Sequence, residues 1–185
     1  MRKQTYNNLL FYRLEDSERW PKFERANFMQ QLNSFADSVY SKNTTEGYLA
    51  ALLIYQQLCE EMIKLLIECS NFLIQLSVFP SEIKAIIKND AMFGQLLSEL
   101  ERGVLDDNIK LFISECRRLN GLRIKMVHKI TLKTSIDDIK KQSKQAKNIF
   151  DKIFNIFESE YDFYRVNFHD YKKNIEDLRE LVKNK

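Results

Sequence analysis

The chain has 185 residues, which is enough for the core of one domain, and it contains only four glycines and two prolines. So few turn-forming residues argue against a sandwich or barrel of many short strands. The aromatic share of 12% excludes a largely disordered chain, and the net charge of +3 is small for a chain of this length.

Two helices are predicted before residue 80, after a first stretch of about 20 residues with mixed polarity. Pro21 suits the first turn of a helix, and an approximate apolar stripe of Phe23, Phe28, Leu32 and Phe35 extends it to Tyr40. Asn43 and Glu46 have the spacing of a capping box, so we expect a long helix to begin there and to end at Pro80. Its predicted apolar face contains Leu49, Leu52, Leu53, Leu58, Cys59, Met62, Ile63 and Leu66.

Two short helices are predicted next. Ser81 is placed to cap the first, which ends near residues 89–90, and the second runs from Met92 to Glu101. Gly103 follows the second helix and is predicted to act as a left-handed C-cap.

Two longer helices complete the predicted fold. Asp106 or Asp107 opens the first, which continues to Val127 with a predicted kink at 120–121. Ser135 and Asp138 form a second capping-box pattern, which opens the last long helix. This helix is expected to end near Arg165, and residues 167–185 form a further amphipathic segment.

These patterns predict an all-α, up-and-down bundle of about four to five long helices with short connecting helices, in one domain covering residues 1–185. The most apolar run, 62–79, is broken by charged and amide side chains, so we expect a buried helix and no membrane partner. Cys59, Cys69 and Cys116 lie among apolar residues and are read as reduced core thiols. No signal peptide is visible, and a cytoplasmic location is expected.

Basic residues are concentrated in one part of the chain. Residues 117–152 contain eleven Lys or Arg and three Asp, a local balance of +8, whereas the other residues contain 18 basic and 23 acidic groups, or −5. Such a segment indicates a surface that faces a polyanion, and a lysine-rich solvated helix face explains it equally well.

Arg123 and His128 are the candidate catalytic residues. A guanidinium binds phosphate oxygens through a planar fork, and an imidazole exchanges a proton near neutral pH, so together they suit phosphodiester chemistry without a metal. On an ideal α-helix, five residues put the two side chains about 140° apart, unless the helix ends or distorts near Val127. The alternative is that Arg123 is a solvated surface residue and His128 a helix-terminal histidine.

The sequence around these residues resembles the HEPN superfamily of small helical bundles. The family motif is Leu-x-x-Leu-Arg-Asn-x-x-x-His, and it is matched by Leu119, Leu122, Arg123 and His128. An earlier Glu-x-x-Leu-Lys pattern is matched by Glu60 and Lys64, with Ile63 in place of Leu. The resemblance covers residues 43–160.

The resemblance implies a metal-independent endoribonuclease of a toxin or defence system that needs no cofactor. A symmetric homodimer would bring two Arg123–His128 sets together, with RNA as the substrate and Glu60 and Lys129 in supporting roles. Glu60 is otherwise explained by an ion pair with Lys64. The chain departs from the motif at Ile124, where the family usually has Asn.

Non-catalytic members of the superfamily act as antitoxins, regulators or protein-interaction modules, which makes this the alternative function. A cognate antitoxin or regulatory protein is a further possible partner, and a helical bundle unrelated to the family is a third interpretation. His169 is expected to have no catalytic role, because its neighbour Asp170 points to another face of the helix. The aromatic run 150–164 is expected to pack in the core or in a dimer interface.

Overall fold

The computed structural model describes residues 2–81, 91–103, 106–128 and 135–183. Within these ranges the regular secondary structure is all helical and includes no strand, as the sequence predicts. The α-helices are α1 (Arg2–Glu15), α2 (Ala26–Ser41), α3 (Thr45–Ser77), α4 (Phe93–Leu100), α5 (Asp107–Arg123), α6 (Ile136–Lys173) and α7 (Ile175–Lys183). The predicted helix that Ser81 would cap lies outside the described residues.

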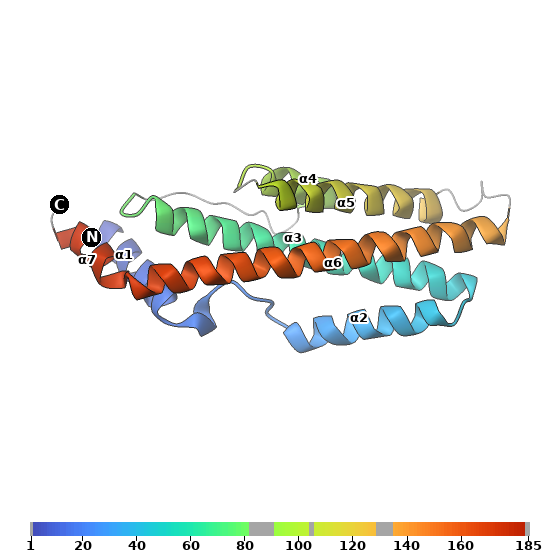
Figure 1. Cartoon of the computed structure of the whole chain (residues 1–185), viewed down its shortest axis with the longest axis horizontal. Helices are drawn as coiled ribbons and strands as arrows, with labels where there is room; N and C mark the ends of the chain where they lie inside the picture. Colours follow the sequence, from blue (N-terminus) through green and yellow to red (C-terminus); the bar gives the residue numbers. More distant parts are fainter. Residues whose placement is uncertain (1, 82–90, 104–105, 129–134, 184–185) are drawn as a thin grey trace.

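Two long helices, α3 and α6, run side by side through the whole bundle (Figure 1). Their direction is parallel, because Tyr55 stacks on Phe150 at 4.3 Å and Phe72 meets Phe168 at 4.8 Å between ring centroids. Buried aromatic and aliphatic side chains along both helices form one continuous core. The α3–α6 pair is therefore the frame on which the other helices pack.

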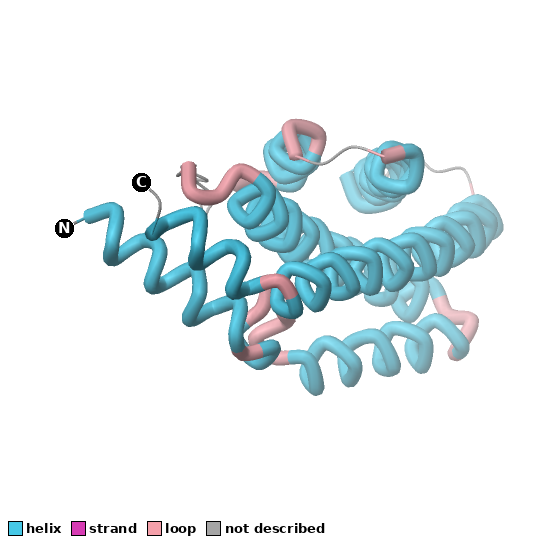
Figure 2. The backbone as a smooth tube through the Cα atoms, turned by 60° about the vertical axis from the view of Figure 1, so that its left-hand side comes forward, coloured by secondary structure: helices cyan, strands magenta, loops and turns pink. Residues whose placement is uncertain are grey.

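Helices α2 and α5 lie on opposite sides of this frame, and α4 lies beside α5 (Figures 1 and 2). On the α2 side, the Tyr55 hydroxyl donates a hydrogen bond to Asp37 of α2 at 2.7 Å. On the α5 side, the buried Glu115 carboxylate binds Arg118 at 2.6 Å and Lys152 of α6 at 2.8 Å. A buried carboxylate needs such partners, so Glu115 ties α5 to α6.

The N-cap residues predicted for two of the long helices are confirmed. Asp106 accepts a hydrogen bond from the Ile109 amide at 2.7 Å, and Ser135 accepts one from the Asp138 amide at 3.2 Å. Each side chain satisfies an amide of the first helical turn that has no partner inside the helix. These residues therefore mark the beginnings of α5 and α6 as predicted.

The start of α3 differs from the prediction. Thr44, and not Asn43, is the N-cap, and its hydroxyl accepts from the Gly47 amide at 3.1 Å. Asn43 has a φ of 56°, a left-handed conformation that asparagine tolerates, and its side-chain oxygen accepts from the Tyr48 hydroxyl at 3.0 Å. Asn43 therefore shapes the turn from α2 into α3.

Helix α2 also differs from the prediction. It begins at Ala26, so Pro21 lies outside it, and the Pro21 carbonyl accepts a hydrogen bond from Tyr161 of α6 at 3.1 Å. Phe28 and Phe35 are 48% and 54% exposed, because the buried face of α2 is the one that carries Ala36 and Val39. The prediction was therefore wrong for Phe28 and Phe35, whereas Phe23 and Leu32 of the same stripe pack against the core.

One predicted C-cap and one predicted helix end were also wrong. Gly103 does not have a positive φ; a glycine is required there because a Cβ atom would lie 2.4 Å from the Ser70 hydroxyl of α3.

Helix α6 does not stop near Arg165 but continues to Lys173, because Tyr164 and Phe168 remain fully buried against the core. Core packing thus extends α6 beyond the point where the sequence pattern weakens. Helix α5 continues through residues 120–121, where a kink was predicted, and ends at Arg123.

Glu160 is a buried carboxyl group at the interface of α5 and α6. Asn108 donates a hydrogen bond to one oxygen at 3.0 Å, while Oε2 lies buried without a hydrogen-bond partner in the described structure. Burial raises the pKa of Glu160, and the neighbouring Asp106 carboxyl raises it further. The ionised form of Glu160 is therefore unfavourable in the folded protein.

We expect Glu160→Gln to raise the free energy of unfolding at pH 7 by about 1 kcal/mol, since an amide keeps the Asn108 bond and removes the buried charge. The raised folded-state pKa contributes stability below the unfolded value of about 4.3, and this contribution is lost as pH rises. The gain should therefore vanish near pH 4 in urea denaturation. Glu180→Gln, at an exposed position of α7, is the control. A variant less stable than the wild type at both pH values would contradict this prediction.

Candidate functional site

The candidate catalytic residues lie at the end of α5. Leu119 and Leu122 of the proposed motif are buried and anchor the last turns of this helix in the core. Arg123 is the last α-helical residue. Sequence order and core packing thus put Arg123 where the α5 helix reaches the end of the bundle.

The helix changes its geometry directly after Arg123. Residues Ile124–His128 form a π-helical segment. Because a π-helix is closed by i→i+5 hydrogen bonds, residues five positions apart lie closer to one face than on an α-helix. The distortion considered for the region near Val127 is therefore present. It reduces the angular separation that an ideal α-helix imposes between positions 123 and 128.

The Arg123 side chain is partly buried, and its Nε atom lies buried without a hydrogen-bond partner in the described part of the chain. Met126 is fully buried and anchors the π-helical segment, whereas Ile124 is 40% exposed. Because this N–H is buried, an anion would reach Arg123 only through the other N–H groups of its guanidinium. Arg123 is therefore held in place by packing on the protein while part of its donor set is unused.

The other predicted site residues are His128, Lys129 and Glu60. The backbone of His128 ends the π-helical segment, and Lys129 lies outside the described residues. Glu60 forms an ion pair with Lys64 at 3.2 Å, which is the alternative role considered for it. Its neighbour Cys59 contacts Cys116 of α5, seven residues before Arg123, so Glu60 lies about 10 Å along the bundle from the level of Arg123.

Tertiary structure neutralises part of the basic segment. Arg117 pairs with Glu101 at 2.8 Å, and Glu115 binds both Arg118 and Lys152. Lys147 pairs with Asp151 of its own helix and with an aspartate of α2. These cations serve the fold, and the local charge of +8 overstates what is available to a ligand.

The remaining cations gather at one end of the bundle. Helices α5 and α6 are antiparallel, since Asn108 contacts Glu160 and Glu115 contacts Lys152, so the end of α5 lies beside the start of α6 (Figure 1). The basic residues at this end form no ion pair within the described ranges, and we call them the basic end: Arg123, Lys125, Lys140, Lys141 and Lys144.

His169, the second histidine, makes an aromatic packing contact. Its ring packs edge-on against Trp20 with 4.6 Å between centroids. It lies 25 residues beyond Lys144 on α6, which is about 38 Å along the helix axis. His169 is therefore remote from the basic end.

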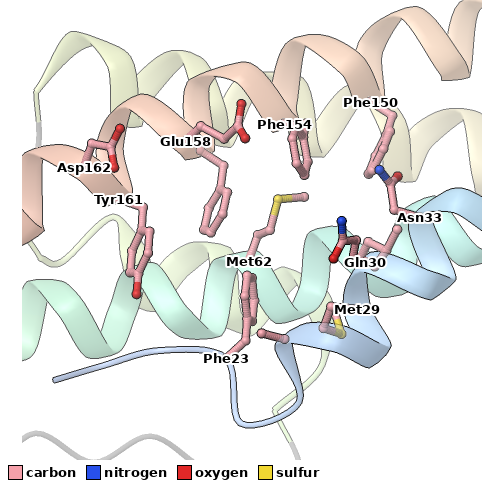
Figure 3. Close-up of a pocket in the computed structure, with 13 residues that line it drawn as sticks. Phe23, Met29, Gln30, Asn33, Met62, Phe150, Phe154, Glu158, Tyr161 and Asp162 are labelled. Carbon is pink, nitrogen blue, oxygen red and sulfur yellow. The ribbon is translucent and has the colours of Figure 1, made fainter. Parts of the chain in front are cut away.

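The structure also contains a cavity that the sequence did not reveal. It has a volume of about 580 Å³ and lies between α2 and α6, above α3 (Figure 3). We call it the α2–α6 cavity. The aromatic run of α6 was predicted to pack in the core, and Phe150 and Phe157 do so, yet their stripe also lines this cavity. The lining comes from three helices and the segment before α2, so no local pattern could have identified it.

In the described part of the chain, no group of three or more His, Cys, Asp or Glu side chains is arranged to hold a metal ion. Among the helices that the structure describes, none has the length and apolar character needed to cross a membrane. All three cysteines are buried and free, and burial raises the pKa of Cys59 and Cys69. Comparison of the chain with protein-family models, curated proteins and solved structures found no match.

Proposed function

We propose that the protein is a HEPN-like, RNA-directed protein that binds RNA through the basic end. The observation that carries this proposal is the basic end itself. Lys140, Lys141 and Lys144 share one face of α6, where like charges three or four positions apart repel each other. A phosphate backbone relieves this repulsion and releases counterions, which makes a polyanion the ligand best suited to this end.

The activity we propose is metal-independent cleavage of RNA. The 2′-hydroxyl attacks the adjacent phosphorus, with His128 exchanging the proton and Arg123 stabilising the charge that develops on the phosphoryl oxygens. The reaction requires both a general base and a general acid, and each chain supplies one histidine at this end. A homodimer that joins two basic ends would supply both groups.

The second candidate function is a non-catalytic binding module, acting as an antitoxin, a regulator or a protein-interaction domain. Ile124 favours it, because a 40% exposed aliphatic side chain occupies the position where the family usually has an amide. An exposed isoleucine beside a cationic face suits a protein interface better than a catalytic centre.

Cleavage of a mixed RNA pool in EDTA tests the two functions. We expect the wild type to leave 2′,3′-cyclic phosphate ends and His128→Ala to lose at least about 10²-fold in rate, as removal of a general acid–base group does. Arg123→Ala should lose a similar factor, since it removes the charge stabiliser. His169→Ala is the matched control and should cleave like the wild type.

The outcomes separate the proposals when RNA binding is measured on the same proteins. Binding without cleavage by the wild type would contradict the ribonuclease and favour the binding module. Equal cleavage by the wild type and His128→Ala would remove His128 from the mechanism. Absence of both binding and cleavage would contradict an RNA-directed function.

A further inference from the structure

The α2–α6 cavity has an apolar floor and an aromatic wall. Leu58, Met62 and Phe150 form the buried floor. Phe157 and Tyr161 stack with 5.8 Å between centroids and 6° between ring planes, and Phe23 contacts Phe157 at 5.6 Å. Its volume of about 580 Å³ lies inside the range of about 300–1,000 Å³ that small-molecule sites occupy.

The polar groups around the cavity include hydrogen-bond acceptors. Gln30 and Asn33 extend from α2 toward α6 in Figure 3, and the Asn33 Oδ1 atom is buried without a hydrogen-bond partner within the described ranges. A buried acceptor without a partner is costly, so an occupant that donates a hydrogen bond would be favoured.

Two carboxylates lie on the α6 edge of the same cavity. Glu158 and Asp162 are exposed, one helical turn apart, and form no ion pair with another described residue. Like charges at this spacing repel each other, and a cation between them would remove the repulsion. Aromatic rings beside them attract cations through their quadrupoles, as Tyr161 does with the Arg165 guanidinium at 5.8 Å from its ring centroid. Charge and ring geometry therefore favour the same kind of ligand.

We propose that the α2–α6 cavity binds a small organic cation, an amine that carries an apolar body. The apolar body fills the space above Met62 and Phe150, and the ammonium group lies toward Glu158 and Asp162. An anionic ligand would face two carboxylates. This site is separate from the basic end, because Glu158 lies 14 residues beyond Lys144 on α6, about 21 Å along the helix.

Methionine methyl groups offer a site-specific test. Met29 and Met62 line the cavity, whereas Met92 and Met126 do not. We would label the full chain with methyl-¹³C methionine and titrate it with phenylbutylammonium, phenylbutanol and phenylbutanoate. We expect saturable shifts of Met29 and Met62 with the amine, about three- to tenfold weaker binding of the alcohol, as two exposed charge pairs allow, and the weakest binding of the acid.

Glu158→Gln combined with Asp162→Asn should remove the preference for the amine over the alcohol. The matched control, Asp177→Asn combined with Glu180→Gln, neutralises two exposed carboxylates of α7 that do not line the cavity, and it should keep the preference. Unchanged signals of the two methionines outside the cavity would show that the variants are folded. Three results would overturn the proposal: no shift up to the solubility limit of the amine, equal binding of the acid, or shifts produced only by a lysine-bearing apolar peptide. None of these results depends on whether the protein binds or cleaves RNA.

Discussion

Reversing three charges at the basic end, with Lys140→Glu, Lys141→Glu and Lys144→Glu combined, is expected to lower the affinity for single-stranded RNA by about a hundredfold near 0.1 M salt. Each phosphate contact to a single strand contributes about 0.7 to the salt slope, so three lost contacts lower the slope by about 2. Fluorescence anisotropy of labelled RNA over a series of salt concentrations measures both quantities.

The matched control changes the net charge by the same amount elsewhere. Lys110, Lys172 and Lys173 lie toward the opposite ends of α5 and α6, so their triple exchange to Glu should leave most of the RNA affinity intact. Equal losses in both triple variants would show that RNA responds only to overall charge. That result would contradict a defined RNA surface at the basic end.

Trp20→Ala is expected to lower the free energy of unfolding by about 3–5 kcal/mol, the range found when a buried large aromatic side chain is removed. Trp20 is only 2% exposed and meets Phe168 of α6 with 5.6 Å between centroids. Its indole N–H also donates to the Leu14 carbonyl at 3.1 Å, which fixes the end of α1 against α6. The substitution leaves a cavity and frees this segment. Urea denaturation followed by circular dichroism measures the loss, because Trp20 is the one tryptophan and its fluorescence disappears.

Two variants separate the contributions to this loss. Trp20→Phe keeps an aromatic ring but removes the N–H donor, so it should cost less than the alanine variant. His169→Ala removes an exposed ring that touches the same indole, and we expect a change within about 0.5 kcal/mol. A small loss for Trp20→Ala itself would mean that α1 contributes little to the stability of the bundle.

Folding stability and RNA affinity are expected to depend on opposite ends of the molecule. Trp20 and His169 lie where α1 meets the end of α6, and the basic end lies at its beginning. Residues this far apart with no shared partners usually contribute independently to stability and binding. Trp20→Ala should therefore act on folding, whereas the lysine substitutions should act on RNA affinity.

Local signals in the sequence were sufficient for the class of fold and for several helix boundaries. Helix α3 was predicted because it is a long apolar segment that is buried over most of its length, with Leu52, Cys59 and Leu66 on its core side. Asp106 and Ser135 were recognised because an N-cap acts within three residues of its own position. The scarcity of glycine and proline excluded the main competing folds.

Tertiary structure alone decided which cations remain available. Lys152 pairs with Glu115, 37 residues away, and Arg117 pairs with Glu101 of another segment. Charge counting along the chain includes these residues in the basic segment, but packing of α5 on α6 neutralises Lys152, and packing of α5 beside the end of α4 neutralises Arg117. The π-helical segment after Arg123 likewise depends on the surrounding packing, since the sequence there fits a regular helix equally well.

The α2–α6 cavity also results from tertiary packing. Met29 of α2, Met62 of α3 and Phe154 of α6 meet only after three helices pack, and their sequence patterns resemble those of ordinary core residues. The spacing of apolar residues along the sequence predicts the apolar and polar faces of one helix, because it depends only on residues of that helix. The depth of a cavity depends on how closely the packed side chains fill the space between helices, and no single helix contains that information.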